Sequence, residues 1–371
     1  MMTTDWVAQY LEQFIKKVAR ENDRLAGKTP YIPYDGFYSD VMIERGYDWW
    51  ANGFWGGILW QLFNATDQDQ FREAAIIQEK RLDRALYEFK DIHHDVGFMW
   101  LLTAVAHYQV TGDEQAYRTG LHAASLLAGR FNIEGNFLVS WNDHPGWVII
   151  DSMMNIQLLY WASEQTGDPR FAKLATRHAQ TVAKYLVRPD GSVGHIASFN
   201  PDTGAFLTQL AGQGVSAESA WSRGNAWALY GFAATYRHTR QLEFLTIAKR
   251  VADYFIQQCQ LTNDIPLADF RAPKVPQIFD TSAGMIAAAG LLALAELLPK
   301  SQQAPYRQAA IKIIQAIVGR YGNWQLTEDG IIGGGTEAYY RPATYEVPLI
   351  YADYFFGEAL LRLKGNALIL W

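Results

Sequence analysis

Thr166-Gly167-Asp168-Pro169-Arg170-Phe171 is a short stretch with the features of one helix ending and another beginning. Glycine favours the left-handed conformation that ends a helix, aspartate is a common N-cap, and proline suits a first helical turn. Apolar residues then recur at helical spacing, at Phe171, Leu174, Ala175, Ala179 and Val182. We therefore expect a tight turn here, followed by an amphipathic helix.

Similar turns recur along the chain. Close relatives of this stretch occupy residues 65–71 and 111–117, and weaker echoes occupy residues 238–244 and 300–306. The aromatic residues near their ends are 46 to 73 residues apart, which leaves room for two helices and their loops: Phe71, Tyr117, Phe171, Phe244 and Tyr306. A repeat of this length indicates an array of helical hairpins.

The expected helices alternate between two kinds. One kind is apolar on nearly all sides and covers residues 54–63, 96–108, 153–161, 226–236, 282–298 and 352–363. The other kind is amphipathic and charged, as at residues 70–90 and 170–187. An apolar helix is buried, whereas an amphipathic helix lies at a surface. Six inner and six outer helices closed in a ring predict an all-α fold, an (α/α)6 barrel that spans residues 1–371 as one domain.

The connections between helices differ in length in a regular way. Short turns lead from a buried helix to a surface helix, and long connections lead back, at residues 131–150, 188–219, 261–280 and 322–347. All inner helices should therefore run parallel, with their N-termini and the long loops at one end of the ring. Because long loops on a rigid scaffold tend to carry function, we expect a pocket at this end.

Composition excludes several classes of protein. The chain of 371 residues is 49% hydrophobic and only 19% charged, with a net charge of −6, which argues against nucleic-acid binding. The lone cysteine, Cys259, excludes a disulfide framework and a cysteine-rich metal site. No signal peptide is visible at residues 1–6, and the longest apolar run, at residues 283–295, is too short to span a bilayer. We expect a cytoplasmic protein that binds neither nucleic acid nor membrane.

Two aspartates stand at the expected starts of inner helices. Asp95 precedes the helix at residues 96–108, and Asp151 precedes the helix at residues 153–161. Each aspartate taken alone is explained as a helix cap. Two carboxylates in one apolar pocket can instead hold different protonation states, so that one donates a proton at neutral pH while the other stays charged. The pair therefore indicates acid–base chemistry.

Other side chains are expected near the same pocket. Arg223 opens an inner helix, where it would pair either with a substrate carboxylate or with one of the aspartates of the pocket. Trp141 and Trp147 lie in a long loop and are expected to form flat walls suited to sugars, within a chain that holds 13 Trp, 20 Tyr and 19 Phe. His195 lies in another long loop, where a single histidine is most often incidental.

Motifs for other chemistries are missing from the sequence. The run His93-His94-Asp95 has no His-Glu-x-x-His pattern and no cysteine partner, so we expect no metal. The glycine run at residues 333–335 has no Lys-Ser/Thr after it, and no Gly-x-Ser-x-Gly elbow occurs. A glycan-active acid–base enzyme is the leading class, although spacing alone does not name its reaction.

The residues at the inner-helix starts resemble those of glycoside hydrolase family 88, the unsaturated glucuronyl hydrolases. The resemblance extends from Trp50 to Glu358 and rests on six stretches in order: WANGFWGG (50–57), HDVGF (94–98), IIDSMMN (149–155), WSRGNAW (221–227), DTSA (280–283) and DYFF (353–356). Members of this family act on oligosaccharides that end in a 4,5-unsaturated uronic acid. They hydrate that vinyl ether, rather than displacing a leaving group directly as ordinary glycosidases do.

The resemblance implies a role for each matching position. Asp151 would be the general acid and base, and Asp95 would assist it. Substrate-binding residues would be Trp50, Phe54, His94, Trp141, His195, Gln213, Arg223 and Trp227. No cofactor and no metal are implied, and the chain would be a monomer or a homodimer with an unsaturated, glycosaminoglycan-type oligosaccharide as its partner. The role of the loop at residues 333–348 stays open.

Three alternatives remain at this stage. An unsaturated rhamnogalacturonyl hydrolase acting on pectin fragments would share the fold and differ in the sugar beyond the unsaturated one. A sugar 2-epimerase-like (α/α)6 enzyme would rely on paired histidines, for which His93 and His94 match poorly. A non-catalytic glycan-binding protein would keep the aromatic residues but would need neither Asp95 nor Asp151.

Overall fold

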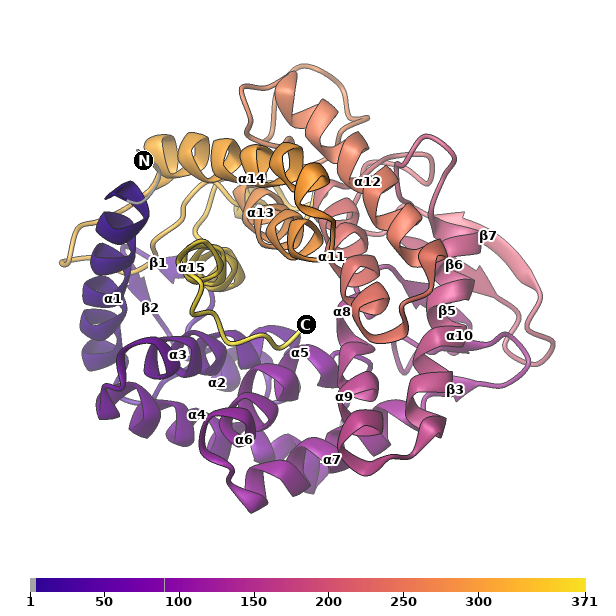
Figure 1. Ribbon diagram of the computed structural model, residues 1–371, viewed down its shortest axis with the longest axis horizontal. Coiled ribbons are helices and arrows are strands. Elements are labelled where there is room, and N and C mark those ends of the chain that lie inside the picture. Colours follow the sequence, from indigo (N-terminus) through magenta and orange to yellow (C-terminus); the bar gives the residue numbers. More distant parts are fainter. Residues whose placement is uncertain (1–4, 90) are drawn as a thin grey trace.

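Helices form two concentric rings (Figure 1) in the computed structural model, which describes residues 5–89 and 91–371. The inner ring consists of α3 (Gly53–Thr66), α5 (Val96–Trp100) with η2 (Leu101–Val105) and α6 (Ala106–Thr111), α8 (Ser152–Asn155) with α9 (Gln157–Thr166), α11 (Ser222–Thr239), α13 (Thr281–Glu296) and α15 (Ile350–Lys364). Because α15 packs against both α13 and α3, the first and last inner helices meet and close the ring.

The outer ring covers the inner one. It consists of α1 (Asp5–Leu25), α4 (Asp69–Glu88), α7 (Glu114–Ala128), α10 (Pro169–Leu186), α12 (Leu242–Gln260) and α14 (Lys300–Tyr321). The short helix α2 (Val41–Arg45) lies in the connection between α1 and α3. The predicted (α/α)6 barrel is confirmed, with helix bounds that agree to within a few residues. Lys90, the last residue of one predicted outer helix, lies outside the described residues.

The predicted turns form as expected at their strongest occurrences. Gly112 and Gly167 adopt left-handed conformations, with φ angles of 75° and 69°. The carboxylate of Asp113 accepts a hydrogen bond from the N–H of Ala116 at 2.8 Å. Asp168 accepts one from the N–H of Arg170 at 2.9 Å. Glycine ends the inner helix and aspartate starts the outer one, which gives the two hairpins their tight connections.

The weakest echo of the turn was predicted wrongly. Residues 300–306 already lie inside α14, and the turn precedes them, with Pro299 at the N-cap position. Pro305 lies inside α14 and does not end the helix, although proline cannot donate the backbone hydrogen bond expected at that position.

The long connections contain short strands that were not predicted. β5 (Trp147–Ile149), β6 (Ile196–Phe199) and β7 (Phe206–Leu210) form an antiparallel sheet in which Ile149 pairs with Ile196. Two small hairpins join β1 (Pro33–Tyr34) to β2 (Phe37–Tyr38) and β3 (Phe131–Asn132) to β4 (Phe137–Leu138). Strands of two to five residues are too short for an alternating pattern to reveal them.

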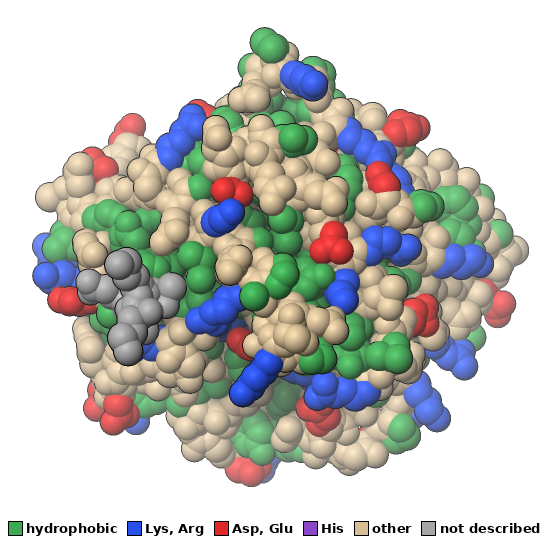
Figure 2. All heavy atoms as spheres, turned by 45° about the horizontal axis from the view of Figure 1, so that its top comes forward, with side chains coloured by type: hydrophobic (Ala, Val, Ile, Leu, Met, Phe, Trp, Pro, Cys, Tyr) green, Lys and Arg blue, Asp and Glu red, His purple; other side chains and the backbone are tan. Residues whose placement is uncertain are grey.

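The surface carries mixed charges. Acidic and basic side chains are interspersed over the face shown in Figure 2 rather than gathered by sign. Among the described residues, no helix has both the length and the apolar composition needed to cross a membrane.

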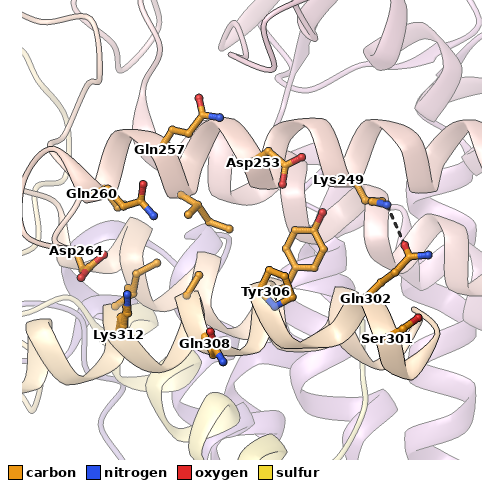
Figure 3. Close-up of a pocket in the computed structure, with 15 residues that line it drawn as sticks. Lys249, Asp253, Gln257, Gln260, Asp264, Ser301, Gln302, Tyr306, Gln308 and Lys312 are labelled. Atoms are coloured by element: carbon orange, nitrogen blue, oxygen red, sulfur yellow. Dashed lines mark hydrogen bonds between the residues drawn. The ribbon is translucent and has the colours of Figure 1, made fainter.

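The molecule has two hollows of similar size. A cavity of about 640 Å³ lies where the inner helices begin, and its lining includes residues from several of the long loops. A groove of about 670 Å³ lies between the outer helices α12 and α14 (Figure 3). The parallel inner helices thus place the cavity at the predicted end of the barrel.

Candidate active site

The cavity brings together most of the residues predicted for the site. Its lining includes seven of them: Trp50, Asp95, Trp141, Asp151, His195, Gln213 and Arg223. They come from several segments that lie far apart in the chain. The predicted convergence of inner-helix starts on one pocket is therefore observed, whereas the role of each residue in binding or catalysis stays a prediction.

Three predicted binding residues do not line the cavity. The Phe54 side chain is fully buried and packs edge-on against Trp50, with ring centroids 5.6 Å apart. Trp227 is fully buried against Phe98, with ring centroids 5.0 Å apart. His94 is fully buried beside Asp95. The ring of helices turns these side chains into the core, so they support the walls of the cavity.

Asp95 is held by three side chains. Its Oδ1 atom accepts a hydrogen bond from Nδ2 of Asn155 at 2.9 Å. Its Oδ2 atom lies 3.2 Å from Nδ1 of His93 and 3.4 Å from Nε2 of His94. Burial alone would raise the pKa of Asp95, but His94, His93 and Asn155 together outweigh burial and lower the pKa to about 2. Asp95 is therefore a fixed negative charge at neutral pH.

Asn155 connects the two aspartates across neighbouring inner helices. Its side-chain oxygen accepts from the N–H of Phe98 at 2.7 Å, which leaves its amide nitrogen to donate to Asp95 and to the carbonyl of Asp151 at 3.4 Å. Gly97 allows this approach because a Cβ atom there would lie 2.3 Å from the Cα atom of Asn155. The glycine thus lets α5 and α8 start side by side.

The side chains of Asp151 and His195 face each other beside the paired ends of β5 and β6. Asp151 follows β5 and His195 precedes β6, and the pairing of these strands places Oδ2 of Asp151 3.5 Å from Nε2 of His195. Neither of these two buried atoms has a hydrogen-bond partner among the described residues. Nδ1 of His195 accepts from the N–H of Gln213 at 2.8 Å, so the neutral ring carries its proton on Nε2, toward Asp151.

Gly212 makes the contact with His195 possible. It has a φ angle of 56°, and a Cβ atom on it would lie 1.8 Å from Nδ1 of His195. Only glycine therefore lets the backbone of residue 213 reach the imidazole and fix its tautomer.

Neither aspartate caps its helix. The side chains of Asp95 and Asp151 make no capping hydrogen bond, although both residues stand at N-cap positions. Asp280, at the same position of α13, does cap its helix through the N–H of Ser282 at 3.1 Å. Helix capping therefore does not explain the two carboxylates in the cavity.

Arg223 forms an ion pair and several hydrogen bonds with other residues of the protein. Its Nη1 atom donates to Oδ2 of Asp280 at 2.6 Å and to the carbonyl of Thr336 at 2.8 Å. Its Nη2 atom donates to Oε1 of Gln213 at 2.8 Å and to the carbonyl of Glu337. The Arg223 side chain is 2% exposed, and its guanidinium also stacks on Trp221. The aspartate that pairs with Arg223 is Asp280, which is not among the residues that line the cavity, rather than Asp95 or Asp151. Through the carbonyls of Thr336 and Glu337, Arg223 also ties the 336–337 loop to the barrel.

Several residues of the cavity were not predicted from the sequence. Tyr31, Trp49, Glu337, Arg341 and Tyr351 all contribute to its lining. Glu337 accepts from Tyr31 and Arg45, each at 2.9 Å, and pairs with Arg341 at 3.2 Å. Burial would raise the pKa of Glu337, but these partners lower it. The one hint in the sequence was the long loop at residues 333–348, whose role stayed open. Contacts between segments about 300 residues apart leave no local pattern in the sequence.

Aromatic rings form two walls of the cavity. Trp50 packs on Tyr351 with ring centroids 4.9 Å apart. Trp141 packs edge-on against Trp147, with ring centroids 5.8 Å apart, and His144 stacks on Trp147, with ring centroids 3.8 Å apart. Such rings offer flat apolar faces beside the polar groups of the floor, an arrangement suited to a sugar. Among the described residues, one group could hold a metal ion: His93, His94 and Asp95.

Known proteins share both the sequence and the fold. The model of Glycosyl Hydrolase Family 88 matches residues 22–356. The unsaturated glucuronyl hydrolase of Bacillus sp. (strain GL1) is 34% identical over 368 residues, which cover 95% of each chain. Its crystal structure superimposes with a TM-score of 0.91 at 32% identity, over 97% of each chain.

A second solved structure contains a bound sugar. It is a mutant unsaturated glucuronyl hydrolase from Streptococcus agalactiae complexed with dGlcA-GalNAc6S. It is 26% identical, has a TM-score of 0.85, and matches 98% of the present chain and 93% of its own. Together with the barrel and its paired carboxylates, these matches show that the chain belongs to glycoside hydrolase family 88.

Proposed function

We propose that this glycoside hydrolase is an unsaturated glucuronyl hydrolase, which removes a 4,5-unsaturated uronic acid from the non-reducing end of glycosaminoglycan-type oligosaccharides. The observation that carries the proposal is the pair of buried, non-capping carboxylates, Asp95 and Asp151, at one end of the barrel. The similarity to enzymes named for this activity supports the same assignment.

In the proposed reaction, Asp151 acts on the C4=C5 double bond. Its carboxyl group donates a proton to C4, and water adds to C5, helped by the resulting carboxylate. The hemiketal formed at C5 then opens, and the rest of the oligosaccharide leaves from C1. The Oδ2 atom of Asp151 supports this role, because it is buried and has no hydrogen-bond partner among the described residues.

Asp95 and His195 assist from two sides of the cavity. Asp95 keeps a fixed negative charge in the cavity, and Asn155 links its carboxylate to the backbone of Asp151. His195 directs its Nε2 proton toward Asp151 and the cavity. This proton would orient the carboxylate of Asp151 once it has given up its own proton.

Gln213 and the aromatic walls would position the sugar. Because Oε1 of Gln213 accepts from Arg223, the amide NH₂ group is left to donate to a ligand. Trp50 and Trp141 would stack on the sugar faces, while Phe54, His94 and Trp227 would hold these walls from behind.

A spectroscopic assay tests this function directly. The conjugated C4=C5 bond of unsaturated disaccharides absorbs in the ultraviolet, and its hydration removes the absorbance. We expect the protein to bleach at least one unsaturated uronyl-hexosamine disaccharide from chondroitin, hyaluronan or heparin. An unsaturated pectin disaccharide tests the rhamnogalacturonyl alternative. Equal cleavage of saturated glucuronides would exclude the vinyl-ether reaction.

A further inference from the structure

Three ligand-bearing side chains converge on one wall of the cavity. Nδ1 of His93, Nε2 of His94 and one carboxylate oxygen of Asp95 all lie within 4.8 Å of one another. Oδ2 of Asp95 is 3.2 Å from the first nitrogen and 3.4 Å from the second.

These separations suit a tetrahedral metal ion. Zinc binds imidazole nitrogen and carboxylate oxygen at about 2.0–2.2 Å, so two ligands of one tetrahedral ion lie about 3.3–3.5 Å apart. The two separations from Asp95 to the histidines are close to this value. A small closure of the two imidazoles would complete three corners of a tetrahedron. The set of two imidazoles and one carboxylate is also one that zinc prefers.

His94 supplies an independent observation. Its ring is completely buried, and neither of its nitrogens has a hydrogen-bond partner among the described residues. A buried imidazole without a partner loses its contacts with water and gains nothing in return, which calls for a ligand or another explanation. Its Nε2 atom is aimed at Asp95, in the direction of the other two ligand atoms.

The access route fits metal binding. His93 and Asp95 line the cavity, so an ion can enter from solvent and keep water at its fourth position.

We propose that His93, His94 and Asp95 form a binding site for Zn²⁺ or a similar borderline transition-metal ion, and that the bound ion inhibits the enzyme. Metal binding itself goes beyond the proposed function, whereas inhibition rests on it. The ion would neutralise the charge of Asp95 and hold its Oδ2 atom. Asp95 could then no longer act as a free carboxylate beside Asp151, and hydration of the substrate would stop.

Metal titration of the full chain tests the site without any substrate. We expect one equivalent of Zn²⁺ to bind in calorimetry, and one equivalent of Co²⁺ to give the visible absorption of a tetrahedral complex. His93→Gln should weaken Zn²⁺ binding by at least about 100-fold, since loss of even a supporting residue costs 10–100-fold. Mg²⁺ should not compete, because imidazole ligands suit it poorly.

Two further variants sharpen the test. His94→Gln should also abolish the Co²⁺ spectrum, and circular dichroism will show whether this buried change preserves the fold. His144→Gln is the matched control, because His144 lies 3.6 Å from Asp143 at the same end of the barrel but belongs to no group of three ligands among the described residues. This control should bind Zn²⁺ as the wild type does.

Separate outcomes decide the two parts of the proposal. The metal site is overturned if excess Zn²⁺ does not bind the wild type, or if it binds His93→Gln equally well. In the ultraviolet assay, Zn²⁺ should stop hydrolysis and EDTA should restore it. Full activity of the Zn²⁺-loaded protein would overturn inhibition alone. A protein that binds Zn²⁺ but bleaches none of the disaccharides would contradict the proposed function and leave the metal site standing.

Discussion

The cavity and the groove between α12 and α14 have nearly the same volume, about 640 and 670 Å³, yet they differ in almost every other respect. The cavity is built from the starts of inner helices and from loops far apart in sequence. The groove is built from two outer helices that are neighbours along the ring (Figure 3). Its labelled side chains are polar, and Lys249 donates to Gln302 at 3.1 Å.

The two hollows differ in the burial of their carboxylates and in the groups that surround them. Asp95 is buried among specific partners, and its pKa falls. Asp253 in the groove is much more exposed than Asp95. The part of it that is buried lacks partners like those of Asp95, so its pKa is raised. A hollow of suitable size is common on a helical protein. A carboxylate buried with its partners already in place is costly to build, and it marks the region where chemistry is expected.

Replacement of the proposed acid should have the largest effect. Asp151→Asn removes the group that donates the proton, while the amide keeps nearly the same shape. We expect the rate of bleaching to fall by about 10⁴-fold, the upper end of the range for acid–base groups. Unaltered activity in this variant would refute the assignment of Asp151 as the acid. The cavity would then have no stronger claim to the chemistry than the groove.

Asp95→Asn should have a smaller effect on the same assay. It removes the fixed negative charge of residue 95 from the cavity, but the proposed proton donor, Asp151, remains. We expect kcat to fall by about 10²–10³-fold, with substrate affinity measured by calorimetry nearly unchanged. If kcat stayed at the wild-type value, Asp95 would be only a structural residue.

Arg223→Met should act through stability. The variant leaves Asp280 buried without its cation, because this carboxylate is fully buried and pairs with Arg223 at 2.6 Å. We expect the free energy of unfolding in urea to fall by about 3 kcal/mol. Addition of Asp280→Asn should recover part of the loss, since both charges are then gone. Equal stability of the wild type and Arg223→Met would contradict the structural role of the ion pair.

The charge of Asp95 should also appear in the pH dependence of stability. Its pKa is about 2 in the folded protein against 3.8 as the ordinary value, so the folded state favours the carboxylate. The resulting stability, about 2 kcal/mol, is fully present above pH 4 and is lost as the pH falls toward 2.

Urea unfolding between pH 5 and 2, in EDTA, will measure this loss for the wild type and Asp95→Asn. The wild type should lose more stability than the variant over this range. Parallel curves for the two proteins would show that Asp95 is not held as a charge in the folded state.

Variants in the groove should have the smallest effect. Asp253→Asn and Lys312→Gln change charged side chains of this hollow without touching the cavity. We expect kcat and KM to stay within about twofold of the wild type, as for exposed positions in general. A large loss of activity in either variant would contradict the view that the chemistry takes place in the cavity and not in the groove.

Much of the fold was predictable because its signals are local. The turn at residues 166–171 contains its own C-terminal glycine, N-cap and N1 proline, and the structure uses all three. The strands β5 and β6 were not predictable, since their pairing depends on two long loops lying side by side. The same pairing sets His195 against Asp151, so that contact has no local signal either.

The sequence by itself determined the alternation of apolar and amphipathic helices, and with it the ring and the end at which the site lies. It also placed Asp95 and Asp151 at helix starts. Only the tertiary structure decided that these carboxylates are not caps, that Asp280 takes up the charge of Arg223, and that Phe54, His94 and Trp227 lie behind the walls. The physical reason is the distance along the chain over which each kind of interaction acts. Helical periodicity and capping act over a few residues, whereas burial and charge pairing depend on which distant segments the closed ring brings together.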